Sequence, residues 1–233
     1  MESKKRDDTM PDTAYIFLAG ASRGVGREVA HCLVKQSLKV KALVRSNAVK
    51  AELEALGITA VLGNALHPEE VEQAMLADPV SMVISTIGGV RADEQRVDFL
   101  GNKHLIDAAV KAKVEKFILV SSIGSGDSAG ALPPQVLETL RPALLAKEQA
   151  ENYLAGSGLV YTIVRPGGLK SEPASGNAVL TPDPTIAGSI NRADVATLVC
   201  QCLSSRKANN RVLSAVDRQM VYVQKDFEIL DLS

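Results

Sequence analysis

The stretch of sequence that decides the fold is Gly20-Ala-Ser-Arg-Gly24-Val-Gly26. An apolar run, Tyr15–Leu18, stands before it, and apolar residues recur at helical spacing from Gly24 to Ser37. A dinucleotide pyrophosphate needs a tight turn with bare backbone N–H groups at a helix N-terminus, and glycine allows this because it has no Cβ. The stretch therefore predicts the strand, turn and helix that open a dinucleotide-binding βαβ unit.

Short apolar runs and amphipathic stretches continue to alternate after this turn. The further predicted strands are Val40–Val44, Thr59–Leu62, Val80–Ile84, Phe117–Val120, Val160–Val164, and short ones near Arg211–Leu213 and Val221–Val223. The further predicted helices are Ala48–Leu56, one that begins at Pro68, Val97–Ala112, Leu144–Leu154 and Ala193–Leu203. Continuously apolar strands separated by helices indicate a parallel sheet that is covered on both faces. The fold class we predict is α/β, a doubly wound parallel sheet of the Rossmann type in a single domain.

The chain length fits one such domain. A chain of 233 residues lies within the range of a single α/β unit. Residues 1–13 are charged and mixed in sign, so we expect a flexible tail followed by an NAD(P)-binding Rossmann domain over residues 14–233. Long segments without periodicity usually cover a site. We therefore expect substrate loops near residues 124–141 and 168–189.

Composition excludes several classes of protein. There are 26 Lys and Arg against 27 Asp and Glu, and 3% aromatics, so neither a basic field nor a stacking surface for nucleic acid is expected. No apolar run is long enough to span a membrane, and no secretory signal is visible. We therefore expect a cytoplasmic or plastid-stroma location with reduced thiols at Cys32, Cys200 and Cys202. No metal is expected, because Cys200 and Cys202 lie two apart on a predicted helix and do not share a face, and the histidines His31, His67 and His104 are scattered.

The end of the second strand indicates the choice of cofactor. A chain that prefers NAD usually carries Asp or Glu here for the ribose 2′-hydroxyl, but this sequence reads Val44-Arg45-Ser46. Arg45 and Arg23 of the glycine stretch could bracket a 2′-phosphate with charge-assisted hydrogen bonds. The alternative is that both are solvated surface arginines. NADP(H) is favoured over NAD(H).

Taken together, the motifs resemble a known superfamily over residues 15–215. They are similar to the short-chain dehydrogenases/reductases, and most of all to the atypical NAD(P)-binding members of the NmrA-like and biliverdin-IXβ reductase/flavin reductase group. The stretches that carry the resemblance are residues 20–26, 44–45, 63–65, 101–102, 119–124, 161–168 and 190–195. One departure is Asn64, which stands where the family usually has an acid beside the adenine.

The resemblance also implies a set of site residues. Ser122 and Lys147 are the implied catalytic residues, with Ser122 facing the nicotinamide and Lys147 approaching its ribose. The implied cofactor-binding residues are Gly20, Ser22, Arg23, Gly24, Val25, Gly26, Arg45, Ser46, Asn64, Ala65, Thr86, Ile87, Gly88, Ser121, Lys147, Arg165, Pro166, Gly167 and Gly168. Simpler alternatives stay open for five site residues. Ser121 and Ser122 could be turn hydroxyls, Lys147 an exposed helix lysine, and Gly167 and Gly168 only part of a turn.

The proton donor of the usual chemistry is missing. Typical superfamily members use tyrosine in a Tyr-x-x-x-Lys helix turn as the general acid, but Ala143 stands four residues before Lys147. Conjugated acceptors such as a flavin, a linear tetrapyrrole or a quinone can take their proton from solvent. The first hypothesis is therefore an NADPH-dependent oxidoreductase that transfers hydride directly to such an acceptor, against an apolar wall of Leu132, Pro133, Pro134 and Leu169.

Another hypothesis comes from a different class of protein. A catalytically weak regulator or assembly factor could sense the NADPH/NADP⁺ ratio and act through a protein partner, as NmrA-like proteins make conceivable. Epimerase or dehydratase chemistry is disfavoured because it normally needs the same tyrosine. The expected partner is thus a small-molecule acceptor or a protein, and we expect a monomer.

Overall fold

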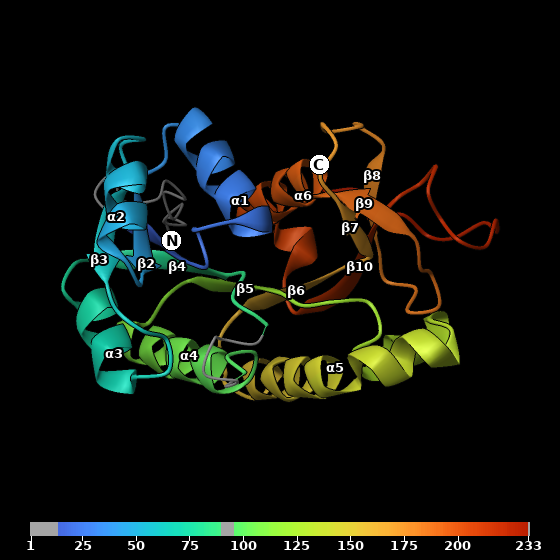
Figure 1. Cartoon of the computed structure of the whole chain (residues 1–233), viewed down its shortest axis with the longest axis horizontal. Helices are drawn as coiled ribbons and strands as arrows, with labels where there is room; N and C mark the ends of the chain where they lie inside the picture. Colours follow the sequence, from blue (N-terminus) through green and yellow to red (C-terminus); the bar gives the residue numbers. More distant parts are fainter. Residues whose placement is uncertain (1–13, 90–95, 233) are drawn as a thin grey trace, which may run out of the picture.

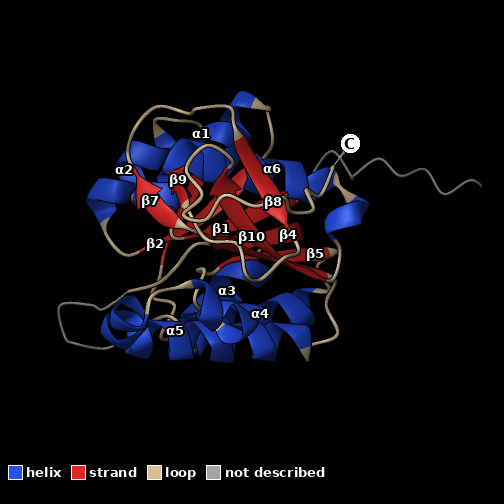
Figure 2. Cartoon of the chain, turned by 90° about the vertical axis from the view of Figure 1, so that its right-hand side faces the viewer, coloured by secondary structure: helices blue, strands red, loops and turns tan. Residues whose placement is uncertain are grey.

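The computed structural model describes residues 14–89 and 96–232 as a three-layer α/β domain (Figures 1 and 2). The predicted tail at residues 1–13 lies outside the described residues. A sheet with the order β3-β2-β1-β4-β5-β6-β10-β8 forms the middle layer. Its strands are β1 (Tyr15–Ala19), β2 (Val40–Val44), β3 (Thr59–Leu62), β4 (Val80–Ser85), β5 (Lys116–Val120), β6 (Tyr161–Pro166), β8 (Ala178–Thr181) and β10 (Arg211–Asp217). Every pair is parallel except β10 with β8, which confirms the predicted doubly wound sheet.

Helices cover both faces of the sheet. They are α1 (Gly24–Lys35), α2 (Asn47–Glu54), α3 (Pro68–Leu76), α4 (Leu100–Ala112), α5 (Pro134–Ala155) and α6 (Arg192–Ser204). In Figure 1, α1 and α6 lie above the sheet and α3, α4 and α5 below it. Strand β1 serves both layers because its side chains alternate. Leu18 packs in the core with α1 and α6, and Phe17 packs in the core with α3, α4 and α5.

Helix α5 is longer than the sequence predicts. It begins at Pro134 instead of Leu144 and contains Pro142 in its interior. Pro134 fits the first turn because the N–H that proline lacks has no helical partner there. The predicted loop over residues 124–141 therefore holds a 3₁₀ turn (Gly126–Ala131) and the first turns of α5.

The predicted loop over residues 168–189 is also partly ordered as strand. It contains β7 (Gly168–Lys170), β8 and the start of β9 (Ser189–Asn191), and β7 pairs with β9 in a small separate sheet. The predicted strand Val221–Val223 is wrong, since Val221 makes only an isolated bridge to Gly188. This bridge brings the C-terminal segment against the second loop, which local sequence patterns could not indicate.

The cysteines of α6 are core residues. Cys200 and Cys202 are buried, and all three cysteines of the chain are free thiols. Burial raises the pKa of the Cys202 thiol to about 11, so it is a packing group at neutral pH. Among the described residues no cluster of metal-ligating side chains is found, and no helix there is long and apolar enough to cross a membrane.

Candidate cofactor site

The strand order places a topological switch point between β1 and β4, where a ligand crevice is expected. These neighbours are not consecutive in the chain, and the connections after them lead to opposite sides of the sheet. In open α/β sheets, ligands bind at the carboxyl ends of strands at such a switch point. The glycine stretch follows β1 and Thr86 follows β4, so both line this point. Thr86 also ties the two ends together, because its N–H donates to the Ala19 carbonyl over 2.9 Å.

Backbone geometry requires glycine at positions 20 and 26. Gly20 has φ +98°, a conformation that side chains disfavour. A Cβ on Gly26 would overlap with the Gly20 carbonyl oxygen and the Thr86 hydroxyl, and would lie 2.7 Å from the Gly20 carbonyl carbon. Helix α1 thus begins directly against the end of β1. The unpaired N–H groups of its first turn therefore lie at the switch point, an arrangement typical of pyrophosphate sites.

Because Gly24 has no side chain, a residue from α6 lies close to its backbone. Arg192, the first residue of α6, puts Nε 3.7 Å from the position that a Cβ on Gly24 would take. Its Nη1 donates to Ser171 Oγ over 2.7 Å. A cavity of about 540 Å³ lies here, lined by Arg23, Gly24, Arg27, Glu28, Ser171, Glu172, Arg192 and Ala193. Residues 190–195 carry part of the family resemblance, but the sequence does not indicate the contact between Arg192 and Gly24, because it joins residues distant in the chain.

The residues predicted for the adenosine end follow β2 and β3. Arg45 is exposed directly after β2, and Ser46 caps α2 by accepting a hydrogen bond from the Val49 N–H over 3.4 Å. Asn64 follows β3 and shapes its own turn, because its side chain accepts the Leu66 N–H over 3.1 Å. Ala65 is buried beside it. The exposed side chain of Arg45 thus stands at the end of β2.

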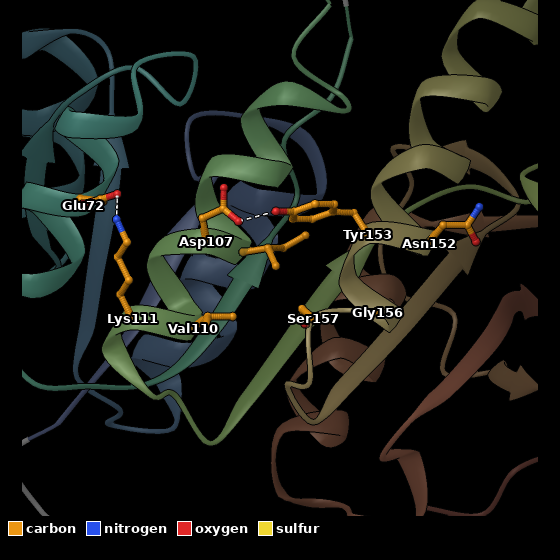
Figure 3. A pocket seen from close by; sticks show the side chains of 9 residues that line it. Glu72, Asp107, Val110, Lys111, Asn152, Tyr153, Gly156 and Ser157 are labelled. Carbon is orange, nitrogen blue, oxygen red and sulfur yellow. Dashed lines mark hydrogen bonds and ion pairs between the residues drawn. The ribbon is translucent and has the colours of Figure 1, made fainter.

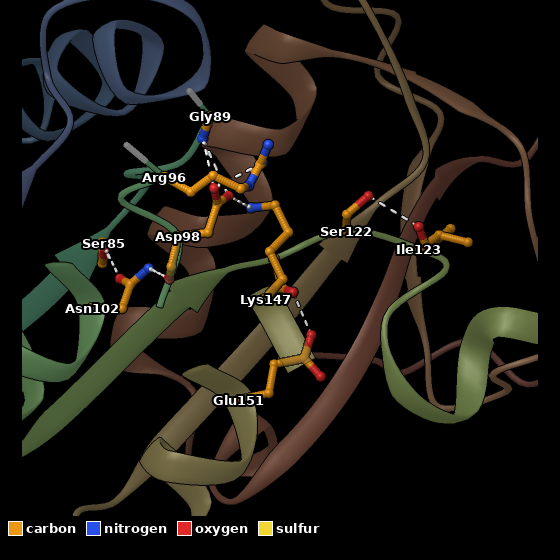
Figure 4. Close-up of polar contacts among 10 residues, drawn as sticks. Ser85, Gly89, Arg96, Asp98, Asn102, Ser122, Ile123, Lys147 and Glu151 are labelled. Carbon is orange, nitrogen blue, oxygen red and sulfur yellow. Dashed lines mark hydrogen bonds and ion pairs between the residues drawn. The ribbon is translucent and has the colours of Figure 1, made fainter. Parts of the chain in front are cut away.

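The residues predicted for the nicotinamide end come from β4, β5 and α5 (Figure 4). Ser122 follows β5, is half-buried and donates its hydroxyl to the Ile123 carbonyl over 3.0 Å. Lys147 reaches from α5 toward the loop after β4. A Cβ on Gly88 would lie 3.1 Å from its Nζ. The structure therefore brings Lys147 to the Thr86–Gly88 segment.

The Lys147 side chain is mostly buried but keeps some exposure to solvent. Its side chain is 18% exposed, and Nζ lies 3.5 Å from Oδ1 of Asp98. Burial lowers the pKa of the Lys147 ammonium, while the carboxylates of Asp98 and Glu151 oppose this and Arg96 adds to it. Asp98 was not predicted from the sequence, since no motif marks it.

Two predicted cofactor residues have their side chains engaged inside the fold instead. Arg165 donates from Nε and Nη2 to Glu151 over 3.1 and 2.6 Å, and also pairs with Asp127. Ser121 donates its hydroxyl to the same Glu151 carboxylate. These contacts join the side chains of both residues to one carboxylate of α5. The physical reason is that a buried carboxylate on α5 needs donors, and the ends of β5 and β6 provide them.

The glycines after β6 have a packing reason of their own. A Cβ on Gly167 would overlap with the Gly188 carbonyl oxygen, so two backbone segments can meet after Pro166 only without side chains. A Cβ on Gly168 would lie 3.0 Å from the Tyr222 hydroxyl. Tyr222 is exposed, and it brings an aromatic ring to a loop that has none in its own sequence. Sequence reasoning missed this residue.

Another cavity lies away from the crevice (Figure 3). Its volume is about 570 Å³, and it is lined by Glu72, Ile106, Asp107, Val110, Lys111, Asn152, Tyr153, Gly156 and Ser157. The Tyr153 hydroxyl donates to Asp107 over 2.6 Å. Apart from Glu72 of α3, these residues lie in the last turns of α4 and α5 or directly after α5, in the segments that lead to the starts of β5 and β6. This cavity is therefore at the edge of the sheet opposite the cofactor site.

Comparison with known proteins agrees with this geometry. The model of the NAD(P)H-binding family matches residues 20–206. An uncharacterized chloroplastic protein of Arabidopsis thaliana, At2g34460, is 34% identical over 219 residues, which cover 88% of this chain and 78% of that protein. Protein TIC 62 of Oryza sativa, also chloroplastic, is 31% identical over 228 residues, covering 86% of this chain and 46% of its own length.

A solved structure extends the similarity to the whole domain. ChuY of Escherichia coli O157:H7, described as an anaerobilin reductase, superposes with a TM-score of 0.81 at 30% identity, covering 91% of this chain and 100% of ChuY. The matches place the chain among NAD(P)H-binding oxidoreductases. With the glycine turn at its switch point, the chain belongs to the NAD(P)H-binding family, as an atypical, NmrA-like short-chain dehydrogenase/reductase of the Rossmann fold.

Proposed function

We propose that the protein is an NADPH-dependent reductase of a conjugated acceptor and works without a tyrosine acid. The observation that carries this is the composition of the nicotinamide end. Lys147 and Ser122 stand at the crevice, while the position one helical turn before Lys147 holds Ala143. Alanine can neither donate nor accept a proton. The acceptor must therefore be one that delocalises the added charge and draws its proton from solvent.

The residues of the crevice fit such a reaction. NADPH, when bound, supplies the hydride. The glycine loop and the N-terminus of α1 would hold its pyrophosphate, and Lys147 would donate to hydroxyls of the nicotinamide ribose. Ser122 would orient the nicotinamide or polarise the acceptor. Catalysis would then rest on holding donor and acceptor in contact, which is worth several orders of magnitude in rate.

A linear tetrapyrrole is the acceptor we favour among the three classes. The similarity to ChuY supports it, because by its name the substrate of that reductase is a bilin. Tyr222 adds an exposed ring beside Gly168, and Leu132 and Leu169 add aliphatic groups near the same loops. A flat conjugated molecule could pack against these side chains and the nicotinamide.

Steady-state oxidation of NADPH tests the proposal. We expect turnover with biliverdin, and slower or no turnover with FMN or a quinone. Ser122→Ala should lower kcat about tenfold with little change in NADPH affinity, because the lost hydrogen bond acts at the reacting ring. Thr139→Ala, which removes an exposed hydroxyl of α5, is the matched control. A protein that binds NADPH but oxidises it with none of these acceptors would contradict the proposal.

Cofactor preference is tested by Arg45→Asp. We expect the wild type to bind NADPH more tightly than NADH, and the variant to lose about tenfold or more in NADPH affinity. The introduced carboxylate repels a 2′-phosphate and can accept from a ribose 2′-hydroxyl, so NADH affinity should hold or improve. Fluorescence titration with both cofactors measures this. Equal wild-type affinity for the two cofactors would show that Arg45 is only a surface arginine.

A regulatory role is the other candidate, and the similarity to TIC 62 favours it. A cofactor can shift binding of a partner only if its oxidised and reduced forms favour different conformations. Pull-downs in NADPH and in NADP⁺ distinguish the roles. Different retained proteins, with no turnover in the assay above, would favour the regulator. The chloroplastic relatives support the plastid-stroma alternative for location, and the monomeric state stays a prediction.

A further inference from the structure

Asp98 is a fully enclosed charge at the nicotinamide end of the crevice (Figure 4). Its side chain is 0% exposed, yet it belongs to none of the motifs that indicate the cofactor site. The Gly89 N–H donates to its two carboxylate oxygens over 3.2 and 3.1 Å. Arg96 Nη2 donates to Oδ2 over 2.9 Å, and Lys147 Nζ lies 3.5 Å from Oδ1. One carboxylate thus contacts a loop backbone and two cations.

The backbone of Asp98 is fixed to the end of β4. Asn102 Nδ2 donates to the Asp98 carbonyl over 2.6 Å, and Ser85 Oγ donates to Asn102 Oδ1 over 2.5 Å. Ser85 is the last residue of β4, one residue before Thr86 at the switch point. The carboxylate therefore has a defined position relative to the crevice. It extends from a backbone that this chain of hydrogen bonds ties to β4.

The Asp98 carboxylate is also closely packed against the Gly88 backbone and Lys147. A Cβ on Gly88 would lie 2.8 Å from Oδ1 of Asp98 and 3.1 Å from Nζ of Lys147. The ammonium, the carboxylate and the Gly88 backbone are thus in mutual contact. Lys147 is the part of this group that belongs to α5, while the others follow β4. Asp98 connects two elements that line the crevice from different sides.

We propose that Asp98 is a positioning residue of the cofactor site, which holds the Lys147 ammonium and the Gly88–Gly89 backbone in place for the nicotinamide half of NADP(H). The inference rests on the proposed function. It explains how the lysine keeps an anionic neighbour when Ala143 replaces the tyrosine of the usual helix turn. A buried carboxylate that only stabilised the fold would not need to lie beside a lysine whose side chain is partly exposed at the crevice.

The protonation of Lys147 gives the proposal a distinctive readout. The charged groups that face its ammonium are Asp98 after β4, Arg96 in the same connection and Glu151 on α5. Asp98→Asn removes an anion, so the pKa of Lys147 should fall. Arg96→Gln removes a cation, so the same pKa should rise. Opposite shifts from two neighbouring substitutions are an effect that loss of stability cannot produce.

Two measurements on the full chain test this. Carbon-13 NMR of labelled lysine, with Lys147→Arg to assign the signal, follows the protonation of Lys147 in the absence of cofactor. NADPH titration across pH follows its consequence. In Asp98→Asn we expect about tenfold weaker binding near neutral pH and loss of binding at a lower pH than in the wild type. In Arg96→Gln the loss should move to higher pH.

The matched control is Asp107→Asn. It removes a carboxylate of α4 whose Oδ2 lies 2.7 Å from Lys103 Nζ, in a part of the molecule away from the crevice. This variant should change neither the pKa of Lys147 nor the NADPH affinity. If Asp98→Asn does not fold, the upward shift in Arg96→Gln still decides the matter. Unchanged NADPH affinity in folded Asp98→Asn would overturn the inference. Absence of NADPH binding in the wild type would instead overturn the proposed function, and the two failures are thereby distinguishable.

Discussion

Gly26→Ala is expected to abolish NADP(H) binding. A Cβ at this position would overlap with the Gly20 carbonyl oxygen and the Thr86 hydroxyl, and both groups belong to the switch point itself. The Gly20 carbonyl is backbone and cannot give way without separating the start of α1 from the end of β1. Misplacing a group by about 1 Å can lower a reaction rate about a hundredfold, and we expect at least as large a loss in NADPH affinity. Overpacking should also lower the free energy of unfolding by about 1–3 kcal/mol.

The control for this variant is Gly130→Ala. Gly130 has no heavy atom within 4 Å of the position of an added Cβ, so the same chemical change should leave affinity and stability unchanged. NADPH fluorescence titration gives the affinity, and urea unfolding gives the stability. A folded Gly26→Ala protein that binds NADPH within threefold of the wild type would show that the glycine turn does not hold the cofactor.

The sequence predicts the sheet and the glycine turn well because their signals are local. Apolar runs identify strands wherever both faces are covered, and β3 was predicted with the bounds that the structure shows. The turn after β1 is a single continuous stretch, so its glycines can be read without knowing the rest of the fold. The start of α5 is different. Its first turns are mostly exposed and carry Pro134 and Pro142, so apolar periodicity begins only near Leu144.

The polar part of the site could be predicted only in part because it depends on contacts between distant segments. Lys147 and Ser122 follow from the resemblance to a family, but Asp98 acquires its role from Gly89 and from a lysine on another helix. Tyr222 reaches the loop at Gly168 through the C-terminal segment. No spacing rule in the sequence marks such pairs. They follow from the topology of the sheet, which brings the carboxyl ends of the strands together.

Arg165 shows that the place of a residue in a motif does not by itself determine what its side chain contacts. It lies at the carboxyl end of β6, near the crevice, yet its guanidinium binds the buried Glu151. The side chains of this pair are 6% and 5% exposed. Removing one partner of a buried pair leaves an uncompensated charge, which typically costs about 3–5 kcal/mol. Arg165→Met is therefore expected to lower the free energy of unfolding by about that amount, as measured by urea denaturation.

Two further variants separate this structural role from cofactor binding. Arg141→Met removes an exposed pair with Glu138, whose side chains are 66% and 75% exposed, and should cost less than about 0.5 kcal/mol. The double variant Arg165→Met with Glu151→Met replaces the buried pair by apolar groups and should recover most of the lost stability. Asp127 needs no replacement, because its side chain is 70% exposed and can be hydrated. If the double variant is stable and binds NADPH like the wild type, Arg165 is a residue of the fold; a selective loss of affinity would return it to the cofactor site.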